Sequence, residues 1–268
     1  MSSKLRCGAA ILLLLALCLG GSFPNAIAET QISPDETMAH YTLDSFIRSF
    51  SSGNSKRGKA GEMTHAETVA ALRKLGITIP EQAVEDVEAA MATSRAYLEE
   101  YGFNARETDY EFPLSLLMHV GMGSYDSDTG MWVPSSLQVY AFDTEVFDIE
   151  GMYQLYLQGL SSIIPKFQPA DVHEHIETYA KNDEQFLMPE GKTTVSFMLN
   201  GKRFEWTVDF YGDWFNDEVI SLTNELLKQE GFDGRIHSFY DGGQGMVLLY
   251  GDKAYGKKLR EIIPQSFF

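Results

Sequence analysis

The chain has 268 residues, and its 38 Asp and Glu outnumber its 21 Lys and Arg, which gives a formal net charge of −17. A surface this acidic repels nucleic acid and anionic lipid, and it favours solubility and weak attraction to cations or basic partners. The composition therefore argues against nucleic acid as a partner, but it does not identify the partner.

The first 28 residues have the three parts of a secretory signal peptide. Lys4 and Arg6 form a positive n-region, residues 9–21 form an apolar h-region, and a small-residue cleavage site ends at Ala28. The apolar run is shorter than the roughly 18 residues that a membrane span needs. We therefore expect cleavage after Ala28, no stable membrane span afterwards and a secreted or extracytoplasmic location; an uncleaved anchor is the alternative.

Both cysteines, Cys7 and Cys18, lie inside this signal. The mature chain is therefore expected to be cysteine-free, with no disulfide, no thiol nucleophile and no thiolate metal site. Removing Lys4 and Arg6 with the signal leaves 19 basic and 38 acidic side chains, a net charge of −19. About 240 residues suffice for one large domain or two small ones.

Residues 29–61 are expected to form a flexible entry segment with one short amphipathic helix. The segment ends in a polar linker rich in Ser and Gly at 51–58. The helix is indicated by apolar residues at helical spacing, which are Leu43, Phe46, Ile47 and Phe50. Docking of this helix on the core and binding of it to a partner both fit the pattern.

Residues 62–130 are expected to form a helical region. Thr64 and Glu67 have the spacing of a capping box, and Gly76 ends the helix that they begin. A second helix, over 80–102, has one apolar stripe and one acidic face. A third helix at 114–120 and a turn at 125–130 complete the region.

Residues 131–268 are expected to form an α+β region, which begins with a strand at 137–142 and a helix at 152–163. Asp143 or Asp148 can cap this helix, and Pro165 stops it. The sequence leaves open whether this region and 62–130 form one continuous domain.

Asn200-Gly201 is the favoured loop of a two-residue β-hairpin. The hydrophobic alternation of the two arms predicts the same register as the turn does, so that all the apolar side chains share one side of the ribbon. The predicted cross-strand pairs are Leu199 with Lys202, Phe197 with Phe204, and Val195 with Trp206.

Asp213 is then expected to cap a helix that Gly231 ends. A second hairpin follows, with arms at 236–240 and 246–250, and a helix over 253–263 closes the chain. The order hairpin, helix, hairpin, helix predicts an antiparallel sheet covered by helices on one face, and with the helical region before it the fold class is α+β.

His173, His175 and Glu177 are the best candidates for metal ligands. On a strand over 171–178 the three side chains alternate onto one face, and two imidazoles with a carboxylate can form part of a zinc or iron site. The alternative is the polar outer face of a half-buried strand, because a lone His-x-His pair is a weak motif.

Three other patterns are weaker candidates for a functional site. The stretch 126–130 resembles the start of a calcium loop but lacks the later ligands, and the glycine-rich loop 241–245 does not lead into a helix as a phosphate loop does. A group of carboxylates precedes the helix at 152–163, and helix capping and the helix dipole explain part of it without catalysis. These are Asp143, Glu145, Asp148 and Glu150.

Two functions follow from these patterns. The first is an exported, non-catalytic binding or interaction protein, without a cofactor, whose partner is an extracellular or envelope protein or ligand. The alternative is a metal-dependent hydrolase that uses one divalent metal at His173, His175 and Glu177.

Overall fold

The computed structural model describes residues 63–100, 111–126, 131–145, 150–179, 190–241 and 243–263. The predicted signal peptide, the entry segment and Asp148 lie outside these residues. No helix in the part of the chain that the structure describes is both long enough and apolar enough to cross a membrane.

The described elements comprise helices and antiparallel strands. In chain order they are α3 (His65–Lys74), α4 (Glu81–Glu100), α5 (Phe112–Gly121), β1 (Ser124–Asp126), β2 (Met131–Val133), β3 (Val139–Asp143), α6 (Met152–Ile163), β4 (Ala170–Tyr179), β5 (Glu190–Leu199), β6 (Lys202–Asp209), α7 (Glu218–Gln229), β7 (Arg235–Tyr240), β8 (Gly245–Gly251) and α8 (Lys253–Ile262).

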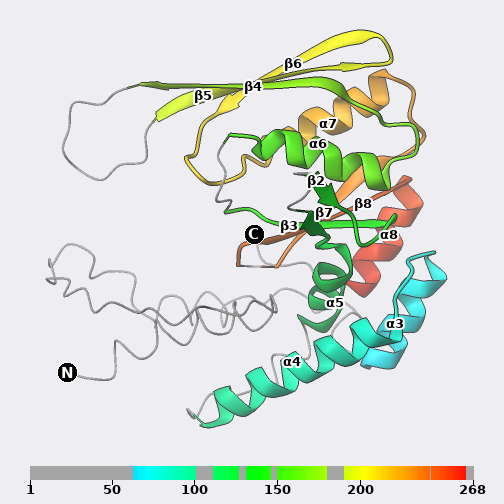
Figure 1. The fold of residues 1–268 in the computed structure, drawn as a ribbon. Coiled ribbons are helices and arrows are strands. Elements are labelled where there is room, and N and C mark those ends of the chain that lie inside the picture. Colours follow the sequence, from blue (N-terminus) through cyan, green and yellow to red (C-terminus); the bar gives the residue numbers. More distant parts are fainter. Residues whose placement is uncertain are drawn as a thin grey trace, which may run out of the picture.

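These elements stack in four layers (Figure 1). The outer sheet β4–β5–β6 covers α6 and α7, which lie on the central sheet β3–β8–β7. Helices α3, α4, α5 and α8 cover the other face of the central sheet. The predicted α+β class with antiparallel pairing is confirmed. The two predicted hairpins, however, lie in two different sheets. The β5–β6 hairpin pairs with β4 in the outer sheet, whereas the β7–β8 hairpin pairs with the distant β3 in the central sheet.

Strand β8 is apolar on both faces because each face lies in a different hydrophobic core. Met246 and Leu248 pack with α6, α7 and the outer sheet, whereas Val247 and Leu249 pack with α3, α4, α5 and α8. All four side chains are buried. A strand covered on both faces has to be apolar along its whole length, as its sequence predicts.

The Asn200-Gly201 hairpin is confirmed, with its register. Asn200 and Gly201 have φ of 53° and 75°, the left-handed values that this turn requires. All three predicted cross-strand pairs form. Phe197 and Trp206 on the inner side are buried and meet edge to face, with ring centroids 4.8 Å apart.

Two predicted helix caps are wrong. Asp213 lies in a turn before α7, where Trp214 bridges to Glu145, and the helix begins only at Glu218. The side chain of Asn216 accepts a 3.0 Å hydrogen bond from the backbone N–H of Glu218 instead. Asp143 is the last residue of β3 and does not cap α6.

Helix α6 is capped by a residue of another element. Its N-cap position is Gly151, with φ of 113° and no side chain to accept a hydrogen bond. Glu174 of β4 accepts a 2.5 Å hydrogen bond from the backbone N–H of Gln154 in the first turn. A carboxylate here also suits the positive end of the helix dipole, and it ties the outer sheet to the helix layer. The capping box of Thr64 and Glu67 in α3 forms as predicted.

Candidate functional site

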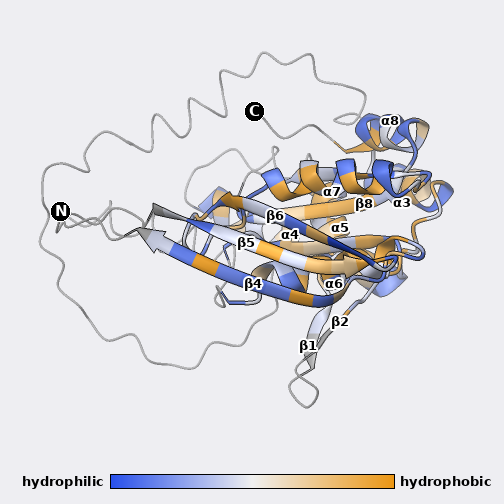
Figure 2. Ribbon diagram, turned by 90° about the horizontal axis from the view of Figure 1, so that it is seen from above, coloured by the Kyte–Doolittle hydropathy of each residue, from blue (hydrophilic) through white to orange (hydrophobic). Residues whose placement is uncertain are grey.

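The predicted metal ligands lie on the outer face of the outer sheet. His173, His175 and Glu177 are exposed on one side of β4, and no described helix covers this side (Figure 2). Their neighbours across the sheet are polar too, and on β5 they are Ser196, Thr194 and Lys192. The shared face is confirmed, and it has the character of a solvated sheet surface.

The spacing along β4 limits what these side chains can do together. Four residues of strand span roughly 13 Å, so His173 and Glu177 are widely separated relative to metal–ligand bonds of about 2 Å. Among the described residues, no three His, Cys, Asp or Glu side chains converge as a metal centre requires. A metal at this face stays a prediction for chemical analysis to decide.

A pair of carboxyl groups lies at the end of the central sheet. Asp143 of β3 is the cross-strand partner of Gly245, and the Asp241 carboxylate packs over the same glycine from the other side. A Cβ atom on Gly245 would lie 2.2 Å from Asp241 Oδ2, so a larger residue there would have to displace the Asp241 carboxylate. Asp241 Oδ1 accepts hydrogen bonds from the N–H groups of Gly243 and Gly245, at 2.8 and 2.9 Å.

This environment makes both carboxyl groups harder to ionise. Desolvation raises the pKa of Asp143, and the nearby charges of Glu145 and Asp241 raise it further. Desolvation also raises the pKa of Asp241, although that residue as a whole is exposed, because its carboxyl group is packed against Gly245. The hydrogen bonds of the pair are local, because Asp241 closes the β7–β8 loop and Asp143 accepts from the N–H of Glu145 just beyond β3, so we assign the two carboxyl groups a structural role.

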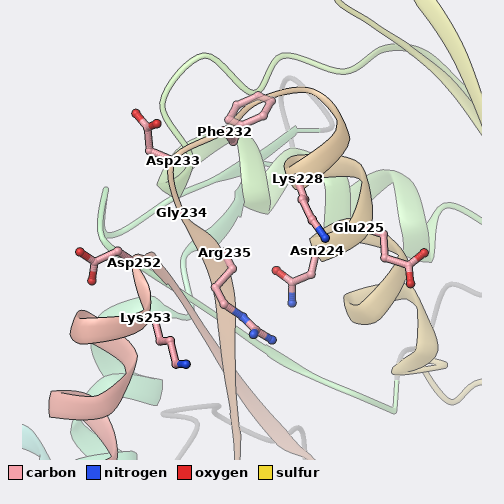
Figure 3. A pocket seen from close by; sticks show the side chains of 9 residues that line it. All are labelled: Asn224, Glu225, Lys228, Phe232, Asp233, Gly234, Arg235, Asp252 and Lys253. Atoms are coloured by element: carbon pink, nitrogen blue, oxygen red, sulfur yellow. The ribbon is translucent and has the colours of Figure 1, made fainter.

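An open groove of about 380 Å³ lies between α7 and α8, and we call it the α7–α8 groove (Figure 3). The N-terminal end of β7 crosses its floor. The residues that line the groove come from α7, the α7–β7 loop, β7 and the start of α8. They are Asn224, Glu225, Lys228, Phe232, Asp233, Gly234, Arg235, Asp252 and Lys253.

Three elements each contribute one cation to the groove. Lys228 comes from α7, Arg235 from β7 and Lys253 from the first turn of α8. Within the described chain, none of the three forms an ion pair. The Asp233 and Asp252 side chains point away from Arg235 in Figure 3. Asp252 is engaged elsewhere, because its Oδ1 accepts a 2.7 Å hydrogen bond from Tyr255 N as the cap of α8.

A buried histidine lies next to the groove. His237, two residues after Arg235 on the same side of β7, fits against Gly256 of α8, and its Nε2 lies 3.2 and 3.0 Å from the carbonyl oxygens of Gly251 and Asp252. Burial lowers the pKa of His237, and the positive charges of Arg235 and Arg260 add to this effect. The imidazole is therefore neutral at pH 7, with a proton on Nε2 that it donates to these carbonyls.

Sequence reasoning missed the groove because its residues belong to elements that are separate along the chain. One signal was available: residues 253–260 carry four basic side chains and no acidic one, in a chain where acids predominate. They are Lys253, Lys257, Lys258 and Arg260.

Comparisons with protein-family models, with curated proteins and with solved structures found no match for this chain. Its function is therefore argued from the geometry of its own residues.

Proposed function

We propose that this chain is an exported, non-catalytic binding protein that holds its ligand in the α7–α8 groove. The observation that carries the proposal is the convergence of Lys228, Arg235 and Lys253, from three separate elements, on one hollow of about 380 Å³. That volume is within the range of small-ligand sites. Lysine and arginine side chains that form no ion pair within the protein are available to form charge-assisted hydrogen bonds with a ligand.

The polar groups of the groove suit binding more than catalysis. Asn224 uses its amide on the backbone of Ile236, with Nδ2 donating to the carbonyl at 3.2 Å and Oδ1 accepting from the N–H at 2.7 Å. Asp252 caps α8. The groups left to contact a ligand are charged side chains and the ring of Phe232, which recognise and orient a molecule.

A ligand screen on purified residues 29–268 tests the binding function. Small molecules of each charge class would be compared by the shift they cause in thermal unfolding, because a ligand at 100 times its Kd stabilises the native state by about 2.7 kcal/mol. We expect at least one class to raise the midpoint in the parent protein and to lose its effect in Lys228→Trp, which fills the groove. Arg203→Trp, on the outer sheet, is the control and should respond as the parent does. A screen in which no molecule acts would reject the groove.

Two further measurements test export and the metal-dependent alternative. N-terminal sequencing of the protein recovered outside the cytoplasm should begin at Glu29, and a chain that retains Lys4 and Arg6 would contradict cleavage at Ala28. Elemental mass spectrometry of the purified protein should find no stoichiometric metal. About one zinc, iron or manganese per chain that disappears in the His173→Ala/His175→Ala double variant would instead favour the hydrolase.

A further inference from the structure

The three groove cations have to be explained in a chain where acids outnumber bases by 38 to 21. Elsewhere in the described structure, Arg73, Lys192 and Lys202 are each paired with a carboxylate. Lys228, Arg235 and Lys253 have no such partner, which is also true of Arg203, Lys257 and Arg260, but the first three come together along one groove, which three acids also line. None of these acids forms an ion pair with the three cations in the described residues, so the cations remain open to an anionic ligand.

The geometry of the groove shows how an anion would be held. Arg235 extends from β7 between α7 and α8, and its guanidinium is seen between the Lys228 and Lys253 side chains in Figure 3. Its planar fork matches the two oxygens of a carboxylate or phosphate group. Lys253 lies at the first position of α8, next to Asp252, whose carboxylate already caps the helix, so its ammonium group is the positive charge that α8 adds to the groove.

We propose that the α7–α8 groove binds a small anion bearing carboxylate or phosphate groups, with Arg235 as its main recognition residue and Lys228 and Lys253 as flanking charges. This inference rests on the proposed binding function and gives the chemical class of the ligand. The neighbouring acids Glu225, Asp233 and Asp252 restrict the site to small anions, because an extended polyanion would meet them.

His237 supplies an internal reporter of an anion in the groove. The groups around its ring are Arg235 on β7, Arg260 and Tyr255 on α8, and the carbonyls of Gly251 and Asp252. An anion paired with Arg235 neutralises one of the two positive charges that oppose protonation of the ring. The pKa of His237 therefore rises when the groove is occupied and falls back when the anion is removed.

The experiment titrates residues 29–268 with inorganic phosphate and, separately, with succinate, following binding by calorimetry and the His237 ring by NMR between pH 5 and 8. We expect saturable binding of at least one probe, an upward shift of the His237 pKa on saturation, and at least a tenfold weaker Kd in Arg235→Gln. Lys253→Gln should weaken binding severalfold, and Arg203→Gln, an equal loss of charge on the outer sheet, should not change it. A preference for phosphate or for succinate identifies which oxyanion the groove takes.

The outcomes separate this inference from the proposed function. If neither probe binds while a neutral or cationic molecule from the screen binds and is blocked by Lys228→Trp, the groove is a ligand site but not an anion site. If an anion binds equally well to Arg235→Gln and Lys253→Gln, without moving the His237 pKa, it binds elsewhere and the inference fails. If nothing of any class binds, both proposals fail.

Discussion

The side-chain amide of Asn224 forms hydrogen bonds with both backbone groups of Ile236, at 2.7 and 3.2 Å. Ile236 belongs to β7, an edge strand of the central sheet, and its N–H and C=O point outward where no strand pairs with them. An asparagine on α7 thus replaces a missing strand over one residue, and it protects an edge that could otherwise pair with another chain.

Removing this contact should destabilise the protein. Asn224→Ala leaves both groups of Ile236 without partners and should lower the free energy of unfolding by about 2 kcal/mol, and Asn224→Asp, which keeps the acceptor but places a carboxylate oxygen against the Ile236 carbonyl, should cost at least as much. Urea unfolding measures both values. Ser221→Ala, an exposed change on the same helix, should stay within about 0.5 kcal/mol of the parent, and equal losses at both positions would contradict the role of the amide.

Glu174 should matter more than its neighbours on β4 because it caps α6. Glu174→Ala removes the acceptor for Gln154 N and should cost about 1 kcal/mol of unfolding free energy. Glu177→Ala removes an equal charge from the exposed face and should cost less than about 0.5 kcal/mol. Denaturant unfolding at pH 7 compares the two. The cap would be unimportant if both variants matched the parent.

Gly256 and His237 should behave as one unit. A Cβ atom on Gly256 would lie 2.1 Å from the His237 ring, so Gly256→Ala should cost about 1–3 kcal/mol through overpacking. His237→Ala removes the ring, and in that background the added methyl group has room. A double-mutant cycle should therefore show that the two losses are less than additive, and strict additivity would mean that the ring moves aside freely.

Stability should fall as the pH is lowered from 7.5 to 5.5 because of His237. Its native pKa is lowered from the ordinary 6.5, so below pH 6.5 the unfolded chain binds a proton that the native state refuses, which favours unfolding. The stabilisation is complete above pH 6.5 and is lost as the pH drops toward the native pKa. Urea unfolding at several pH values should give a shallower dependence for His237→Gln, and identical slopes would count against the assignment.

Asp143 has the opposite dependence. Its native pKa is raised above the ordinary 3.8, so the native state prefers the protonated acid, and ionisation at neutral pH works against folding. The Asp143→Asn variant should therefore be more stable than the parent at pH 7, with the difference shrinking toward pH 4. Glu177→Gln serves as the control for loss of an exposed charge. An Asp143→Asn variant no more stable than this control at pH 7 would show that neither burial nor the neighbouring charges of Glu145 and Asp241 oppose ionisation of Asp143.

The sequence predicted what is determined locally. The turn at Asn200-Gly201 and the capping box of Thr64 need only their immediate neighbours, and both form as expected. The start of α7 could not be predicted in this way, since the good capping residue Asp213 is not used and the N-cap position, Asp217, forms no side-chain cap hydrogen bond. Trp214 forms an isolated β-bridge with the distant Glu145 just before the helix, which local sequence patterns do not show.

Longer-range features were beyond sequence patterns for the same reason. Thr144 bonds to the carbonyl of Gln244, 100 residues further along, where β3 meets β8, and no local periodicity announces that pairing. The sequence predicts that β3 and β8 are strands, but it does not predict that they pair in one sheet. The α7–α8 groove depends likewise on where α7 and α8 pack around the open end of the β7–β8 hairpin, where Arg235 pairs with Gly251, so only the basic character of its residues was visible beforehand.

Strand β8 makes the two hydrophobic cores mechanically dependent on each other. Leu248 faces one core and Val247 the other, and adjacent residues of one strand cannot be released separately. If the helices at 63–100 or the outer sheet with its helices separated from the central sheet, one face of β8 would be exposed to water. The opposite face belongs to the other core, which would then lose its support. The backbone amides of β8 should exchange with solvent only when the whole molecule unfolds, which makes this strand the slowest-exchanging segment of the chain.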